Sequence, residues 1–68
     1  MFKGPWELTC TEDMEVNDRL AFVKGQTYRV KDKFPGDDGT VETGVWEMVS
    51  DGRLIDVSLE QRERHFSA

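Results

Sequence analysis

The sequence predicts a small all-β domain in which five short strands curl into a barrel. Apolar and polar residues alternate with a period of two in several short stretches, which is the pattern of half-buried strands. Turns that contain glycine separate these stretches. The 68 residues suffice for one hydrophobic core, so we treat residues 1–68 as a single domain. A barrel buries one continuous face of such a sheet and reduces its open edges, which favours it over a flat sheet.

The first strand is predicted over residues 6–11. Trp6, Leu8 and Cys10 alternate there with polar residues and are expected to share the buried face. Residues 12–18 are acidic and show no period, so we expect them to form a surface loop.

The central strand is predicted over residues 26–32. The apolar run 20–23 before it is too short for a helix and is expected to pack under the preceding loop, before Gly25 turns the chain. Within the strand, Tyr28 and Val30 face the core and the residues between them face solvent. The remaining strands can be arranged around this one.

A long turn and a further strand follow. Residues 34–39 contain a Pro-Gly pair and a second glycine, the densest turn signal in the chain. Residues 44–49 form the next predicted strand, with Glu47 in its middle. A carboxylate at that position should face water, which turns Trp46 and Met48 inward.

An Asp-Gly pair within residues 50–53 predicts a tight hairpin into the strand 54–57. Asp56 should face water in that strand, which places Ile55 and Val57 in the core.

The C-terminal segment predicts a short helical or 3₁₀ turn before a last strand. Ser58 and Gln61 match a capping box, and the residues after them are good helix formers. An SH3-like barrel, which carries such a turn before its last strand, fits this order best, and an OB-type barrel fits second. The predicted core comprises Leu8, Cys10, Phe22, Tyr28, Val30, Trp46, Met48, Ile55, Val57, Leu59 and Phe66.

Composition limits the classes of function. The net charge of −5 disfavours general binding to phosphate backbones or anionic membranes. There is no apolar run long enough to span a membrane, and the first residues lack the apolar stretch of a signal peptide. With a single cysteine, Cys10, no internal disulfide can form. We therefore expect a cytoplasmic protein without a membrane partner.

No catalytic, cofactor or metal site is predicted. Cys10 and His65 are the only nucleophile–base pair that the composition allows, and an inward cysteine on an alternating strand is usually a small core residue. Their spacing matches no zinc motif. We expect a protein that is not an enzyme.

A set of structural motifs resembles a group of small phage-encoded proteins of unassigned activity. The motifs are Lys24-Gly25 followed by Tyr28 and Val30, then Trp46, the Asp51-Gly52 pair, Ile55 with Val57, and a terminal Phe66. The resemblance implies an SH3-like barrel. It also implies a protein made in the cytoplasm of an infected bacterium that binds a host or phage protein.

Candidate partner-binding residues are aromatic and charged side chains outside the predicted core. Aromatic residues and arginine are enriched in interfaces, and charged loops steer partners of opposite charge. Arg29, Lys31 and Lys33 are predicted on one solvent face at a spacing of two. The proposed partner-binding residues are Trp6, Phe34, Asp37, Asp38, Arg29 and Lys31.

Three other functions stay open at this point. The basic strand face is consistent with a weak nucleic-acid-binding barrel. The acidic clusters in residues 12–18 and 37–42 are consistent with a nucleic-acid mimic. A homo-oligomer that pairs through the edge of the Trp6 strand would gain the stability that a small core lacks.

Overall fold

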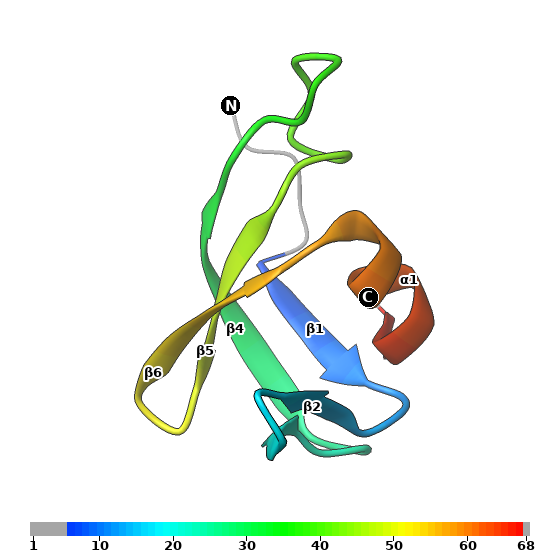
Figure 1. Ribbon diagram of the computed structural model, residues 1–68, viewed down its shortest axis with the longest axis vertical. Coiled ribbons are helices and arrows are strands. Elements are labelled where there is room, and N and C mark those ends of the chain that lie inside the picture. The colour runs from blue at the N-terminus through cyan, green and yellow to red at the C-terminus, as the bar shows by residue number, and fades with distance from the viewer. Residues whose placement is uncertain (1–5, 68) are drawn as a thin grey trace.

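The computed structural model describes residues 6–67, and strands dominate it (Figure 1). The chain begins with β1 (Glu7–Cys10), β2 (Met14–Val16) and β3 (Arg19–Phe22), followed by the long β4 (Thr27–Lys33). It continues with β5 (Trp46–Ser50), β6 (Arg53–Val57), the helix α1 (Leu59–His65) and the two-residue β7 (Phe66–Ser67).

The strands form one five-stranded antiparallel sheet and one separate hairpin. The order in the large sheet is β6-β5-β4-β1-β7, and β2 pairs with β3. The end of the chain returns to its beginning, because Phe66 of β7 lies opposite Cys10 of β1. The all-β prediction is confirmed. In residues 6–67 neither sheet closes on itself, so the structure is an open, strongly curved sheet with β6 and β7 at its edges.

The acidic segment 12–18 contains β2 and the turn into β3, so its prediction as a surface loop was wrong for residues 14–16. Asn17 and Asp18 have φ values of 54° and 65°, which gives the left-handed two-residue turn that joins antiparallel strands. Short polar side chains tolerate this conformation. Met14 consequently lies in β2 and is only 2% exposed. It belongs to the core, although the predicted core did not include it.

The central strand contains a bulge that changes which face its last residues occupy. Val30 lies opposite Met48, but Asp32 lies opposite the adjacent Glu47, so Lys31 is an extra residue on β4. Beyond the bulge the alternation is inverted, and Lys33 lies opposite Trp46. The prediction that Lys33 shares a solvent face with Arg29 was therefore wrong.

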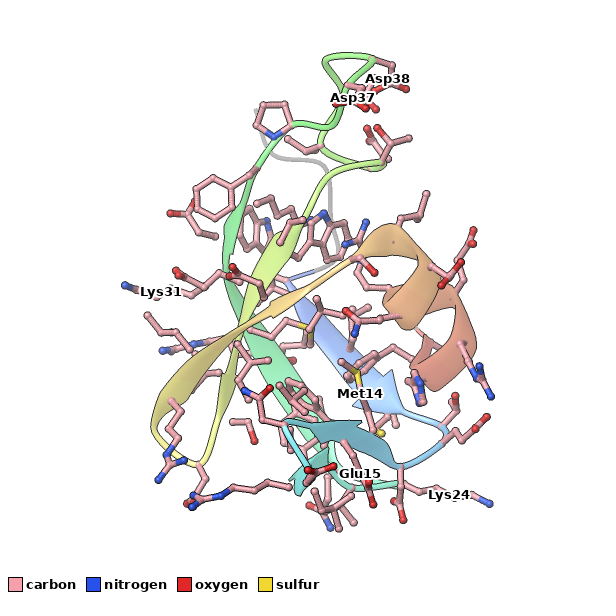
Figure 2. The ribbon with its side chains drawn as sticks, viewed as in Figure 1. Met14, Glu15, Lys24, Lys31, Asp37 and Asp38 are labelled. Atoms are coloured by element: carbon pink, nitrogen blue, oxygen red, sulfur yellow. The ribbon has the colours of Figure 1, made fainter. Side chains whose placement is uncertain are left out.

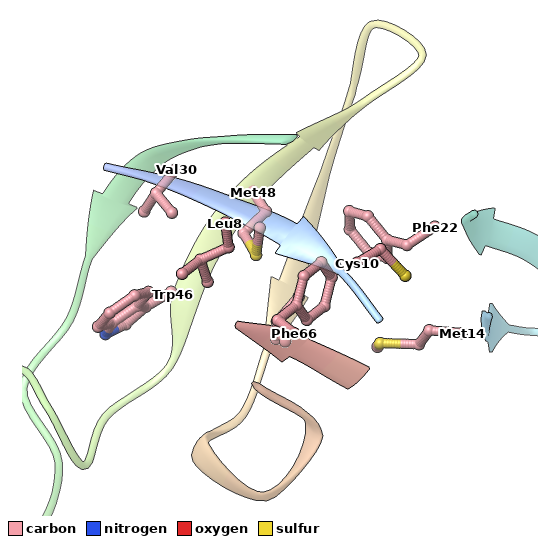
Figure 3. Packing of buried hydrophobic residues seen from close by; sticks show 9 residues of the cluster. Leu8, Cys10, Met14, Phe22, Val30, Trp46, Met48 and Phe66 are labelled. Carbon is pink, nitrogen blue, oxygen red and sulfur yellow. The ribbon is translucent and has the colours of Figure 1, made fainter. Parts of the chain in front are cut away.

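The core follows the predicted alternation closely (Figure 3). Phe22, Met48 and Val57 have no exposed surface. The Phe22 ring packs edge-on against Tyr28 and Phe66, with centroids 4.8 and 5.1 Å apart. Of the predicted core residues, Tyr28, Ile55 and Leu59 are half-buried instead of buried. The buried apolar residues are Leu8, Cys10, Met14, Phe22, Val30, Trp46, Met48, Val57 and Phe66.

Both predicted local motifs at the C-terminal end are confirmed. Asp51 and Gly52 have φ values of 51° and 76° and turn β5 into β6. Ser58 caps α1: its hydroxyl accepts from the Gln61 amide at 3.2 Å, and the Gln61 side chain accepts from the Ser58 amide at 2.9 Å. The segment predicted as a helical or 3₁₀ turn is a seven-residue α-helix.

Candidate functional site

Two tryptophans and two cations form a stack at one end of the core. The Lys33 ammonium lies 4.5 Å from the centroid of the Trp6 ring and 4.0 Å from that of Trp46. The Arg62 guanidinium lies 4.1 Å from the Trp46 centroid. Cations over indole faces are attracted by the ring quadrupole, and the attraction grows when water is excluded. We call these four residues the tryptophan–cation cluster.

Arg62 also fastens a loop to the sheet. Its Nη1 donates to the carbonyls of Gly44 and Val57, and its Nη2 donates to the carbonyl of Glu42, all at 2.8 Å. Arg62 is only 6% exposed, and this desolvation lowers the pKa of its guanidinium below the ordinary value. Arg62 therefore links α1, the end of β6 and the loop 34–45. It is a structural clamp that alternation in the sequence did not predict.

Lys33 is set into the same cluster by the bulge in β4. Desolvation lowers the pKa of its ammonium below 10.5, Glu42 opposes this change, and Arg62 adds to it. The partial burial of Lys33 removes one member of the predicted basic face. The strand face proposed for nucleic-acid contact is reduced to Arg29 and Lys31.

A network of hydroxyl groups organises the tip of the 34–45 loop. The Asp38 carboxylate accepts from the Thr40 amide at 2.9 Å, from the Thr40 hydroxyl at 2.8 Å and from the Thr43 hydroxyl at 2.6 Å. These hydrogen bonds, that of Thr43 above all, lower the pKa of Asp38 below its ordinary 3.8. Asp38, which was predicted to contact a partner, thus also stabilises the loop in which it lies.

We expect the stabilisation of the loop by the Asp38 carboxylate to depend on pH. Because the folded-state pKa of Asp38 is lowered, its carboxylate stabilises the loop fully above pH 3.8, and the contribution is lost as the pH falls through the lowered value. Replacing Thr43 by valine should return the pKa toward 3.8, whereas Thr43→Ser, which keeps the hydroxyl, should leave it low. The ¹³C shift of the Asp38 carboxyl carbon, followed by NMR, measures both. Equal titration of the two variants would contradict the assignment.

Cys10 and His65 meet at one backbone carbonyl. The Cys10 thiol donates to the Glu12 carbonyl at 3.1 Å, and Nδ1 of His65 lies 3.0 Å from the same oxygen. Burial, the largest cause, raises the pKa of the thiol above 9.0. A raised pKa disfavours the thiolate that nucleophilic catalysis requires. The arrangement joins the β1–β2 connection to the end of α1.

A groove lies between the β2–β3 hairpin and the β5–β6 hairpin. It has a volume of about 470 Å³. Leu20 and Leu54, which are 52% and 49% exposed, line it together with the half-buried Ile55. The Ser50 hydroxyl donates to the carbonyl of Ala21 and so connects the two hairpins. We call this feature the hairpin groove; its lining is Val16, Asn17, Arg19, Leu20, Ala21, Ser50, Asp51, Arg53, Leu54 and Ile55.

The predicted partner-binding residues do not gather at one place, and Figure 2 shows Lys31 far from Asp37 and Asp38. Trp6 and Arg29 line a shallow depression of about 540 Å³ with Glu7 and Val30. Lys31 projects from the β4 bulge, whereas Asp37 and Asp38 lie at the tip of the distant loop.

Their exposure also differs. Phe34, at the base of the loop, is 45% exposed, as predicted for a contact residue. Trp6 is half-buried and packs against the core. Trp6 and Arg29 therefore lie at one depression, and the loop residues Phe34, Asp37 and Asp38 do not line it.

Three carboxylates cross the solvent face of the sheet in one row. Asp32 of β4 lies opposite Glu47 of β5, which in turn lies opposite Asp56 of β6. Like charges directly opposite each other destabilise a sheet. The bulge at Lys31 creates this row, because it moves Asp32 onto the solvent face.

Sequence reasoning missed the residues of the hairpin groove. Asn17-Asp18 could have been recognised as a two-residue turn, which would have paired Val16 with Arg19 and made residues 14–22 a hairpin. Alternation alone would put Leu20 and Phe22 on one face; Leu20 lies outside and Phe22 inside because the pairing shifts at Ala21, where Met14 lies opposite Phe22 and Glu15 opposite Leu20. Nothing local in the sequence indicates that this hairpin faces β6.

Residues 6–67 contain no group of three or more His, Cys, Asp or Glu side chains arranged to hold a metal ion. Nor does that part of the chain include a helix with the length and apolarity needed to cross a membrane. Comparison with protein-family models, with curated proteins and with solved structures finds no match to this chain.

Proposed function

We propose that the chain is a non-enzymatic protein-interaction module. Its support is the hairpin groove, where two leucines stay about half exposed although the core beside them is complete. Exposed apolar side chains gathered at one hollow are typical of protein-binding surfaces. Given the resemblance to phage-encoded proteins, the partner would be a host or phage protein in the cytoplasm of an infected bacterium.

The strand order supports an SH3-like plan for this module. The last strand, β7, pairs with β1, and the β2–β3 hairpin is inserted between β1 and β4. A short helix precedes β7, as the resemblance implies. We propose that the curved sheet and the β2–β3 hairpin together wrap the core as an SH3-like barrel.

Reconstitution tests the proposal. The chain is used to capture proteins from a bacterial lysate, and each captured protein is produced separately and titrated into the purified chain by calorimetry. We expect one partner to bind at a fixed stoichiometry with a Kd of about 1 μM or tighter. Light scattering over a concentration series separates this result from self-association. If no captured protein binds the purified chain, the proposal is wrong.

A nucleic-acid mimic is the second candidate, and the row formed by Asp32, Glu47 and Asp56 favours it. Such a row, beside the acidic loop at Asp37 and Asp38, offers negative charge to a basic surface. If the chain is such a mimic, adding duplex DNA should weaken its binding to the reconstituted partner, because both would occupy the same basic surface. Binding that DNA leaves unchanged would exclude this candidate.

A further inference from the structure

We propose that the hairpin groove binds an extended segment of another polypeptide, which carries an apolar and an acidic side chain and adds as a strand to the free edge of β6. The inference rests on the proposed function and deepens it by naming the binding face and the chemistry of the partner. Three independent features of the groove carry it: an open strand edge, an apolar hollow and two arginines.

The open edge belongs to β6. In the part of the chain that the structure describes, this strand is last in the sheet order and pairs with β5 alone. The Asp51-Gly52 turn makes Ser50 and Arg53 a hydrogen-bonded pair, so the main-chain groups of Leu54 and Asp56 point away from β5. Within residues 6–67 no turn or loop hydrogen bond uses them. Such an edge is the template to which an extended segment adds.

The apolar hollow lies beside this edge. Leu20 approaches from the β2–β3 hairpin, and Leu54 and Ile55 line it from β6. The hydrogen bond from Ser50 to Ala21 connects the two hairpins across the hollow, so the site exists before a partner arrives. A volume of about 470 Å³ is within the range of sites that accept several side chains.

The charge of the groove differs from that of the whole chain. Arg19 and Arg53 line it, one from each hairpin, and Asp51 is the only acidic residue in the lining. The chain as a whole has a net charge of −5. Within residues 6–67 neither Arg19 nor Arg53 forms an ion pair, so both groove arginines keep their guanidinium groups available to a carboxylate.

The register of β6 specifies where the acid must lie on the added strand. Arg53 and Ile55 are two residues apart and share one face, whereas Leu54 and Asp56 belong to the other face, where Asp56 lies beside Glu47. A carboxylate above Asp56 would be repelled. The segment should therefore carry its acidic and apolar residues two positions apart, with uncharged residues between them.

A designed peptide tests these requirements. The probe is a capped heptapeptide in which threonine alternates with valine, glutamate and valine, a palindromic pattern that fits either strand direction. In an ¹⁵N NMR titration of the intact chain, we expect amide shifts in β6 and at Arg19 and Leu20. The same peptide with lysine in place of glutamate should bind at least about tenfold more weakly. The double variant Arg19→Glu, Arg53→Glu should invert this preference.

Arg64→Glu is the matched control, because Arg64 is 71% exposed but lies on α1, outside the groove lining; it should leave peptide binding unchanged. Equal affinity for the two peptides, or shifts confined to residues outside the groove, would overturn the inference. A reconstituted partner that binds the double variant as tightly as the native chain would also overturn it, while leaving the proposed function intact. Peptide binding at β6 without any reconstituted partner would support the site and remove the proposed function.

Discussion

Replacing Arg62 by methionine should lower the free energy of unfolding by about 3 kcal/mol. Methionine can still pack against Trp46, but the carbonyls of Gly44, Val57 and Glu42 lose their donor. Buried acceptors without partners are costly, and a chain of 68 residues has a total stability of roughly 3–10 kcal/mol. Urea denaturation followed by tryptophan fluorescence measures the loss.

Arg64→Met is the matched control for this variant. Arg64 lies on the same helix, but its side chain is 71% exposed and its contact with Glu12 is 3.9 Å long. We expect a change below about 0.5 kcal/mol. If Arg62→Met does not fold, Arg62→Lys serves instead, since lysine keeps the charge but cannot reach three carbonyls as a planar fork. Equal effects at positions 62 and 64 would contradict the clamp.

Replacing Gly44 by alanine should destabilise the protein by about 3 kcal/mol or more. A Cβ at this position would lie 1.7 Å from the Phe34 carbonyl oxygen, 2.7 Å from the Pro35 carbonyl carbon and 2.8 Å from the Gly36 amide nitrogen. All three are main-chain atoms, so no side-chain rotation relieves the overlap. The two ends of the 34–45 loop must separate, and the bond from Arg62 to Gly44 is lost with them.

Gly39→Ala separates this clash from the general cost of replacing a loop glycine. Gly39 has a φ of +83°, and a Cβ there would meet no atom within 4 Å. Its substitution should cost about 1 kcal/mol through backbone strain alone. Because Gly44 and Arg62 share one hydrogen bond, their double variant should lose less than the sum of the two single variants. Additive losses would argue against a common role in holding the loop.

The local features of this fold were predictable because a few neighbouring residues determine them. The Asp51-Gly52 turn and the capping box at Ser58 depend on residues at most three positions apart, and both form as predicted. Alternation identified most of the core in the same way. The hairpin at residues 14–22 was missed because the Asn17-Asp18 turn is a weaker signal than Asp-Gly.

The candidate site was hardly predictable. Of the residues that line the hairpin groove, none was among those proposed to bind a partner. Those residues were predicted from two properties: their aromatic or charged side chains and their positions outside the predicted core. A groove instead requires two hairpins to approach each other, and the Ser50–Ala21 hydrogen bond that connects them joins residues 29 positions apart.

By itself, the sequence of this protein determined that its fold is built of β-strands, where its clearest turns lie and which alternating side chains fill most of its core. Only the tertiary structure decided that Lys33 turns inward, that Arg62 is buried beneath a loop and that Leu20 and Leu54 face a common groove. For Arg62 and the groove, the physical reason is that the contacts join segments 18 to 29 positions apart in the sequence. For Lys33, the reason is that a bulge inverts the alternation after Lys31. Whether a bulge forms depends on how β4 and β5 pair, and not on the pattern within either strand.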